Sequence, residues 1–150
     1  MPPANRFMAI ALEEARAAGL RGEVPIGAAL VQGDVVLARA GNRTRERHDV
    51  SAHAEIEVIR AAARELGSER LPGADLYVTL EPCTMCAAAI SFARIRRLYY
   101  GASDPKGGAV DSGVHFFSAP TCHHAPDVYS GFSEVEAGDL LTGFFRALRD

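Results

Sequence analysis

Two short motifs, thirty residues apart, constrain this chain more than any other feature of its sequence. The first is a histidine separated by one residue from a glutamate, and the second is a C-x-x-C pair directly after a proline. The four side chains are His53, Glu55, Cys83 and Cys86. Histidine and cysteine are typical zinc ligands, so a fold that uses these residues together must bring the two motifs to one point.

Each motif lies where the sequence pattern predicts the first turn of a helix. Side chains lean toward the N-terminus of a helix, so first-turn residues can point at a site in front of the helix end. Cys83 and Cys86 are three positions apart and would share one helix face. The helix N-terminus also favours a thiolate over a thiol. We therefore expect both cysteines to bind one ion together with the His53 imidazole.

The number of ligands distinguishes a catalytic zinc site from a structural one. A structural site uses four protein ligands, whereas a catalytic site leaves one position for water. The sequence contains no second C-x-x-C that would supply a fourth ligand, so the pattern favours a catalytic site. Water bound to zinc can lose a proton near neutral pH. Glu55 is too close in sequence to His53 to be a comfortable ligand of the same ion. Burial would raise the pKa of its carboxyl, so we expect Glu55 to transfer protons.

Composition limits the class of protein. With 150 residues, 48% of them hydrophobic and 23% charged, the sequence is typical of one globular domain, which we expect to span residues 1–150. No apolar stretch approaches the length of a membrane helix, and residues 1–6 lack the apolar region of a secretory signal, so we expect a cytoplasmic protein without a membrane partner. Three cysteines do not form a disulfide framework. The net charge of −3 argues mildly against a generic nucleic-acid-binding protein, although arginine supplies all but one of the sixteen positive residues.

Hydrophobic spacing in the first half of the chain predicts two helices around a hairpin. The first helix would end near Gly19, and apolar runs at 26–31 and 35–40 would form the hairpin. Ser51 is the expected N-cap of the second helix, and Gly67 would follow its end. The expected buried stripe of that second helix consists of Ile56, Ile59, Ala63 and Leu66.

The second half of the chain predicts a central strand over 75–80 and another strand over 97–101. Pro82 would occupy the first turn of a third helix that runs to about Ala93, and residues 102–133 would be loops and turns. A final helix would pack onto the sheet through Leu140, Leu141, Phe144, Phe145 and Leu148. These elements predict a layered α/β domain with a mixed sheet.

The combined pattern H-x-E followed by P-C-x-x-C is the established signature of zinc-dependent nucleobase deaminases. Beyond this signature, the sequence resembles the bacterial tRNA-specific adenosine deaminase family of the cytidine/deoxycytidylate deaminase superfamily. The resembling segments are residues 23–28, 41–43, 48–49, 76–81, 101–106 and 144–146. The resemblance extends from about Phe7 to Arg149. Cytosine and guanine deaminases share the zinc signature but usually differ around the cysteines and after Gly101.

The resemblance implies a cytidine-deaminase-like fold, which is a three-layer α/β/α sandwich with a mixed central sheet, and a homodimer with one Zn²⁺ per chain. It implies that a zinc-activated water converts the wobble adenosine of a tRNA anticodon loop to inosine. His53, Cys83 and Cys86 would hold the zinc. Glu55 would move a proton from the water to adenine N1 and would then protonate the leaving ammonia.

The resemblance also implies which residues contact the substrate. Asn42 would hydrogen-bond the base, assisted by a backbone N–H near Ala54. Ile26 and Leu80 would be apolar positions near the pocket. Core packing is an equally good interpretation of both. The residues expected to contact the anticodon stem-loop are Asp104, Lys106, His123, Phe145, Arg146 and Arg149. At position 123 the family commonly has asparagine, whereas this chain has histidine.

Three other functions stay open on the sequence alone. A deaminase of free guanine, cytosine or a nucleoside fits the acidic net charge, although the 104–106 segment and the C-terminal Phe-Phe-Arg argue against it. A non-catalytic zinc-stabilised binding module would have no need of Glu55. A redox dithiol protein would also place C-x-x-C at a helix start, and zinc retained under reducing conditions would exclude it. Residues 121–124 could suggest a second metal site but lack a further ligand at suitable spacing, so a polar loop is the simpler interpretation.

Overall fold

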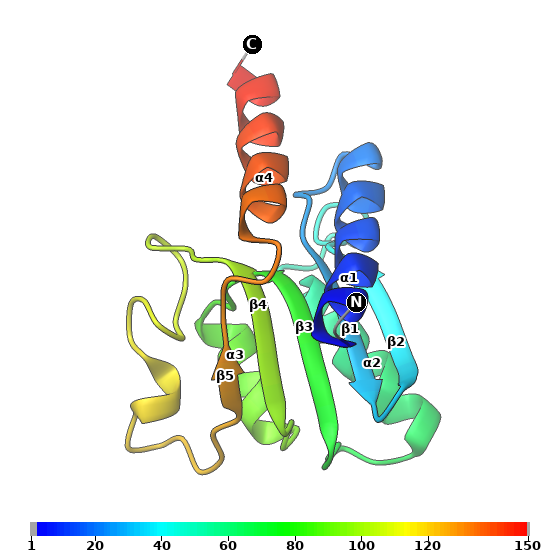
Figure 1. Cartoon of the computed structure of the whole chain (residues 1–150), viewed down its shortest axis with the longest axis vertical. Coiled ribbons are helices and arrows are strands. Elements are labelled where there is room, and N and C mark those ends of the chain that lie inside the picture. The colour runs from blue at the N-terminus through cyan, green and yellow to red at the C-terminus, as the bar shows by residue number, and fades with distance from the viewer. Residues whose placement is uncertain (1–2, 150) are drawn as a thin grey trace.

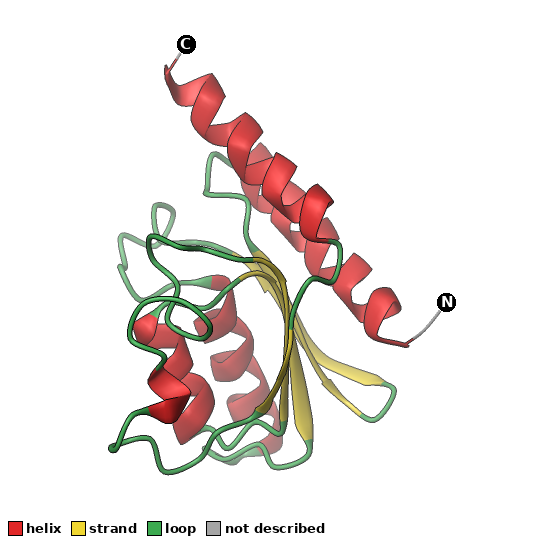
Figure 2. Ribbon diagram, turned by 60° about the vertical axis from the view of Figure 1, so that its left-hand side comes forward, coloured by secondary structure: helices red, strands yellow, loops and turns green. Residues whose placement is uncertain are grey.

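The structure is a computed structural model, and it describes residues 3–149. Five strands form one sheet in the order β2-β1-β3-β4-β5. Helices α1 (Pro3–Leu20) and α4 (Glu134–Arg149) lie on one side of the sheet, and α2 (Ala54–Leu66) and α3 (Thr84–Phe92) lie on the other (Figures 1 and 2). The predicted three-layer α/β/α arrangement is confirmed.

The sheet is mixed, as predicted. Strands β1 (Gly27–Gln32) and β2 (Val35–Gly41) form the expected hairpin, and β1 also pairs antiparallel with β3 (Ala74–Leu80). Strand β4 (Arg97–Ala102) runs parallel to β3, and β5 (Asp127–Tyr129) runs parallel to β4. β3 lies in the middle of the sheet, which explains why it is apolar on both faces. β5 was missed in the sequence because three residues give too little periodicity.

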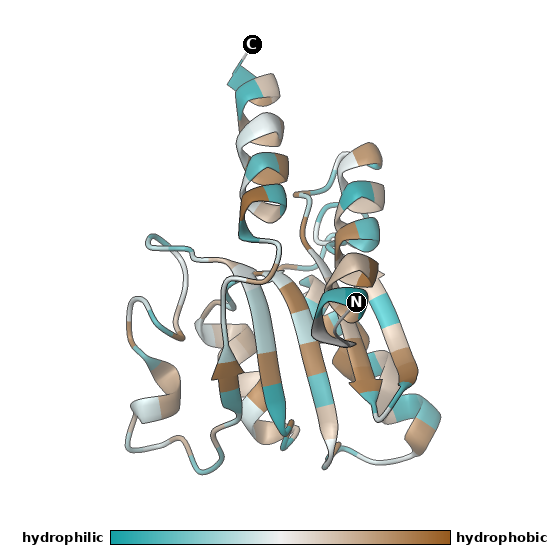
Figure 3. Cartoon of the chain, viewed as in Figure 1, coloured by the Kyte–Doolittle hydropathy of each residue, from teal (hydrophilic) through white to brown (hydrophobic). Residues whose placement is uncertain are grey.

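The two faces of the sheet contribute to two separate cores. On the side of α2 and α3, Leu76 and Val78 of β3 are fully buried. On the side of α1, Tyr77 stacks on Tyr99, which stacks on Tyr129, with ring centroids 4.4 and 5.0 Å apart. Apolar residues therefore recur along β1 and β3 in Figure 3. This rigid sheet fixes the strand ends from which the loops of the site emerge.

The predicted starts of α2 and α3 are wrong, whereas Gly67 follows the end of α2 as its C-cap, as predicted. The N-cap of α2 is His53, and the hydroxyl of Ser51 instead donates to the carboxylate of Asp49 at 2.7 Å. Cys83 is the N-cap of α3, so Pro82 lies just before the helix and not in its first turn. In both helices a residue of the chemical motif itself begins the helix.

The predicted buried stripe of α2 is only partly correct: Ile56 is buried and Ile59 packs against the core, but Ala63 is only half-buried. The side chains that pack on the sheet are those of Ala54, Val58 and Ala62, all fully buried. Leu66 is 45% exposed. Small residues four positions apart allow the helix to lie close against the strands, and this stripe includes the first turn that carries the motif.

Helix α4 forms as predicted but packs on the sheet only near its start. Ala137 is its one buried residue among those described, whereas Phe145 and Leu148 are 44% and 63% exposed. The C-terminal half extends past the edge of the sheet, close to the C-terminal part of α1 (Figures 1 and 2). Within residues 3–149, no helix combines the length and apolar character needed to cross a membrane.

Candidate active site

The N-termini of α2 and α3 bring the two sequence motifs together. His53 and Cys83 are the N-cap residues, and both have extended backbones with φ near −70° to −75°. Glu55 and Cys86 lie in the first turns behind them and are buried. Each helix thus presents its positive end and its motif side chains to the same small volume.

Three ligand atoms meet there. The Nδ1 atom of His53 lies 3.7 Å from Sγ of Cys83 and 3.5 Å from Sγ of Cys86. All three ligand atoms lie within 4.8 Å of one another, and no other group of this kind occurs among residues 3–149. The donor set of two sulfurs and one imidazole suits zinc, and three protein donors leave one coordination position open.

Hydrogen bonding within the cluster shifts the pKa values of the two thiols in opposite directions. The hydrogen bond from Cys86, helped by His53 and opposed by burial, lowers the pKa of the Cys83 thiol to about 4. The same hydrogen bond, together with burial, raises the pKa of the Cys86 thiol. The hydrogen bond to Cys83 also raises the pKa of His53. The cluster therefore already holds one thiolate, which is the form that binds a metal ion.

Glu55 lies beside this cluster with 4% of its surface exposed. Burial raises the pKa of its carboxyl to about 6. A carboxyl that titrates near neutral pH can both accept and donate a proton, which is the property required of a general acid–base group. Glu57, two positions along the same helix, instead faces Arg47, with its Oε1 2.8 Å from the arginine Nε.

The residues predicted to contact the base lie around the same helix ends. Asn42 directly follows β2 and is buried, and its backbone N–H donates to the carbonyl of Ile26 at 3.0 Å. The next N–H, of Arg43, donates to the carbonyl of Ala52 at 2.9 Å. These bonds tie the end of β2 to the residue that precedes His53. Ile26 and the fully buried Ala54 also belong to the core or pack against it.

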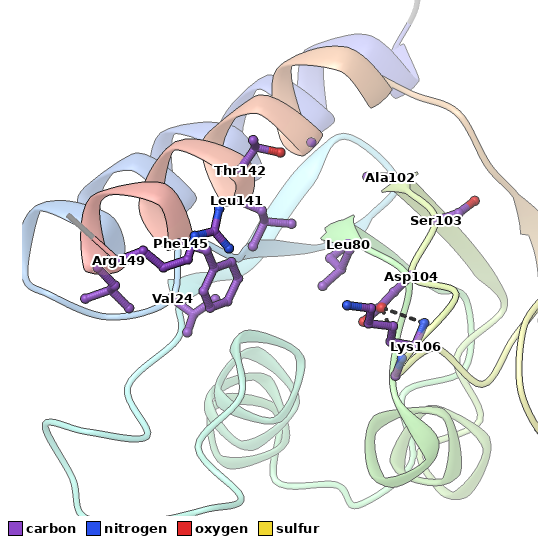
Figure 4. A pocket seen from close by; sticks show the side chains of 13 residues that line it. Val24, Leu80, Ala102, Ser103, Asp104, Lys106, Leu141, Thr142, Phe145 and Arg149 are labelled. Atoms are coloured by element: carbon purple, nitrogen blue, oxygen red, sulfur yellow. Dashed lines mark hydrogen bonds between the residues drawn. The ribbon is translucent and has the colours of Figure 1, made fainter.

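A cleft of about 930 Å³ opens between α4 and the loop after β4. Figure 4 shows Phe145 and Arg149 of α4 on one side and Asp104 and Lys106 on the other. Leu80 lies between them, at the end of the strand that leads through Glu81 and Pro82 into Cys83. Four of the predicted RNA-contacting residues are thus brought together at one cleft.

Two predicted RNA-contacting residues, Arg146 and His123, are not among those that line this cleft. Both are exposed. The neighbouring His124 anchors its segment to the sheet, because its Nε2 lies 2.8 Å from the carbonyl oxygen of Ile95. The Cys122 thiol donates to the His124 carbonyl at 3.2 Å. This segment is therefore a hydrogen-bonded loop, in agreement with the simpler interpretation of its sequence.

Comparison with known proteins agrees with this geometry. Residues 4–149 match the model of the MafB19-like deaminases. The sequence is 72% identical to the tRNA-specific adenosine deaminase of Agrobacterium fabrum over 149 residues, covering 99% of this chain and 98% of that protein. The chain belongs to the tRNA-specific adenosine deaminase family.

Solved structures support membership of the family. A structure from a study of A-to-I editing by tRNA:A34 deaminases at the wobble position of transfer RNA superposes with a TM-score of 0.90 at 75% identity. The match covers 91% of this chain and 99% of that one. The guanine deaminase of Nitrosomonas europaea superposes with a TM-score of 0.82 at 23% identity, covering 96% and 84% of the two chains. This second likeness extends to the fold alone.

In this member of the family, two buried glutamates beside the site were missed in the sequence. Glu23 and Glu81 are each 2% exposed. The carboxylate of Glu23 accepts the backbone N–H groups of Arg45 and Glu46 at 3.1 and 2.7 Å. Burial by itself would raise the pKa of the Glu81 carboxyl, but donors from the loop after β4 hold it below its usual value. A glutamate directly before the Pro-Cys motif was the available signal, but its partners are distant in sequence.

Proposed function

We propose that this protein hydrolyses the wobble adenosine of a tRNA anticodon loop to inosine. The observation that carries the proposal is a buried carboxylate, Glu55, beside a cluster of three metal-ligand side chains. Three residues before Cys83 of this cluster, Leu80 lines a cleft that also contains Lys106 and Arg149. The family relationship supports the same activity. We treat residues 1–150 as a single deaminase domain.

Zinc fits the residues that are present. His53, Cys83 and Cys86 would hold one Zn²⁺ per chain, because sulfur and imidazole donors suit this ion and the cluster already favours a thiolate. When bound, zinc lowers the pKa of water and supplies hydroxide near neutral pH. The sulfurs contribute negative charge that balances the dication in a half-buried site.

Glu55 is the catalytic residue of this proposal. Its carboxylate accepts a proton from the attacking water and delivers it to N1 of adenine, which makes C6 more electrophilic. It then takes the remaining proton from the oxygen now bonded to C6 and donates it to the amino group, so that the C6–N bond breaks, ammonia leaves and inosine remains. Burial serves both steps, because a pKa of about 6 makes the two protonation states of Glu55 similar in free energy near neutral pH.

The neighbouring residues orient the base. The Asn42 amide would hydrogen-bond the purine, and Ile26, Ala54 and Leu80 would provide an apolar surface around it. The positions of two residues support these roles. The residue after Asn42 hydrogen-bonds to the carbonyl of Ala52, directly before His53. Leu80 lines the cleft and lies three residues before Cys83. An unpaired loop adenosine can enter such a pocket without the few kcal/mol needed to break duplex stacking.

The cleft and α4 would bind the rest of the anticodon stem-loop. Lys106, Arg146 and Arg149 would contact phosphates, and the half-exposed ring of Phe145 offers a surface for stacking a base. Asp104 and His123 would contact nucleotides that flank the target. Two of these positive side chains, Lys106 and Arg149, line the same cleft.

The proposal includes a homodimer that works in the cytoplasm, where tRNA is found. Met85 and Phe92 lie seven residues apart on one face of α3 and are 37% and 71% exposed. Two apolar side chains on the same outer helix face support coverage by a second copy.

A comparison of substrates tests the proposal. The protein is incubated at equal concentrations with an anticodon stem-loop bearing a wobble adenosine, free adenosine, guanine or cytosine, at moderate salt. We expect the stem-loop to be deaminated fastest. If guanine or cytosine reacts faster than the RNA, the tRNA substrate is wrong and a deaminase of free bases replaces it.

A further inference from the structure

A single loop surrounds the carboxylate of Glu81 with hydrogen-bond donors. The backbone N–H groups of Val110, Asp111 and Ser112 donate to Oε2 at 3.0, 2.9 and 2.9 Å. The N–H of Asp104 and the hydroxyl of Ser112 donate to Oε1, each at 2.9 Å. These five bonds join the two ends of the 104–112 loop to one side chain.

The charge of Glu81 is balanced by peptide dipoles. Among the ion pairs of residues 3–149, none involves this carboxylate. Consecutive N–H groups that converge on an anion form a concave binding site, and bonds to a charged acceptor are stronger than neutral ones. The loop packs so closely that a Cβ at Gly108 would lie 2.5 Å from Cδ of Glu81. The loop backbone therefore depends on this carboxylate for its position.

Glu81 also joins two parts of the site. It lies between Leu80 at the cleft and Cys83 at the ligand cluster. The loop that it binds carries Asp104 and Lys106. The carboxylate of Asp104 accepts the N–H groups of Lys106 and of the next residue at 3.2 and 3.0 Å, so the hydrogen bonds continue from Glu81 to the tip of the loop.

We propose that Glu81 is a positioning residue that holds the 104–112 loop against the metal-binding helix. In this position, Asp104 and Lys106 contact the RNA while the reacting adenosine lies at the metal-ligand cluster. The inference rests on the proposed function, which assigns these two residues to the RNA. Glu81 itself touches neither substrate nor metal in this account. Its loss should therefore weaken substrate binding much more than the chemical step.

Glu81→Gln is the most selective test. An amide has only one acceptor oxygen, and it would take the place of Oε2, where three N–H groups donate. The NH₂ group would then take the place of Oε1. Because it faces the N–H of Asp104, that hydrogen bond would be lost. We expect faster amide hydrogen exchange at Asp104 and a KM for the stem-loop raised about tenfold, with kcat within about threefold of wild type. Zinc content should not change.

Glu23→Gln is the matched control, because Glu23 is equally buried and also accepts two backbone N–H groups from a loop near the site. It should speed exchange at Arg45 and Glu46 and leave the 104–112 amides unchanged. Gly108→Ala would place its Cβ 2.5 Å from Cδ of Glu81 and 2.6 Å from the carbonyl oxygen of Asp104, so it disturbs the contact between this carboxylate and the loop without altering residue 81. We expect it to raise KM with zinc retained, and this result decides the matter if Glu81→Gln does not fold.

Amide exchange is measured without substrate, so it reports on Glu81 even if the stem-loop is not a substrate of the wild-type protein. Faster exchange at Asp104 together with the KM effect supports the inference. Unchanged exchange overturns it, and so does faster exchange with an unchanged KM. A fall in kcat or zinc content at constant KM also overturns it, because Glu81 would then act through Cys83.

Discussion

The ligand cluster and helix α4 are built in opposite ways. At the N-termini of α2 and α3 the functional side chains are buried or half-buried, and the loops around them are tied down by backbone hydrogen bonds. The C-terminal half of α4 has few partners, and apolar and polar residues alternate along it beyond the sheet (Figure 3). Reacting groups must be held in place before the substrate arrives, whereas a surface for a nucleic acid must stay accessible. Under the proposed function, the difference separates chemistry from RNA binding, so we expect that each part can be altered alone.

The largest expected effect is loss of a metal ligand. Cys86→Ala should abolish both zinc binding and turnover, because two remaining protein ligands are too few to hold the ion. Cys122→Ala is the control, since its thiol is hydrogen-bonded to the His124 carbonyl and belongs to no ligand cluster among the described residues. Elemental analysis of both variants measures the effect. Zinc that depends on Cys122, or a wild-type protein without zinc, contradicts the ligand assignment.

Removing the proton carrier should separate catalysis from metal binding. We expect Glu55→Gln to keep its zinc and to lose about 10²–10⁴-fold in kcat, the usual contribution of a general acid–base group. Glu57→Gln is the control on the same helix turn and should stay within about threefold of wild type, since Glu57 pairs with Arg47 away from the reaction. A Glu55→Gln enzyme with more than a tenth of wild-type activity would show that another group moves the protons.

Substitutions at the cleft should affect RNA binding alone. Arg149→Ala and Lys106→Ala should each lower the slope of log affinity against log salt by about one unit, if each side chain contacts one phosphate. Zinc content and kcat should be retained. Arg64→Ala, an exposed arginine in the last turn of α2, is the control and should leave the slope unchanged. Equal slopes in all three variants would remove the cleft from the RNA-binding surface.

The smallest expected effect concerns stability. Leu148→Ala on α4 should change the free energy of unfolding by less than about 0.5 kcal/mol, because its side chain is 63% exposed. Leu98→Ala in β4 should cost about 2–5 kcal/mol, because its side chain is fully buried. Denaturant unfolding of the two variants measures the contrast. A large loss in Leu148→Ala would show that α4 is covered in solution.

The sequence predicted the ligand cluster because its residue types and spacing are demanding. Local pattern was less informative where competing contacts decide the outcome: Ser51 does not cap α2 because Asp49 accepts its hydroxyl. Periodicity predicted α4 but not the exposure of Phe145, since an apolar face does not specify what covers it. The role of Glu81 could not be predicted from the sequence, because the groups that donate hydrogen bonds to its carboxylate lie 23 to 31 residues later in the chain.

The position of the product in the RNA tests the central claim most directly. An anticodon stem-loop that carries a wobble adenosine and other loop adenosines is incubated with the protein, and inosine is mapped by sequencing, with Glu55→Gln as the control. The account predicts inosine at the wobble position alone, and none with the variant. Inosine spread over all loop adenosines, or formed equally by Glu55→Gln, would contradict it.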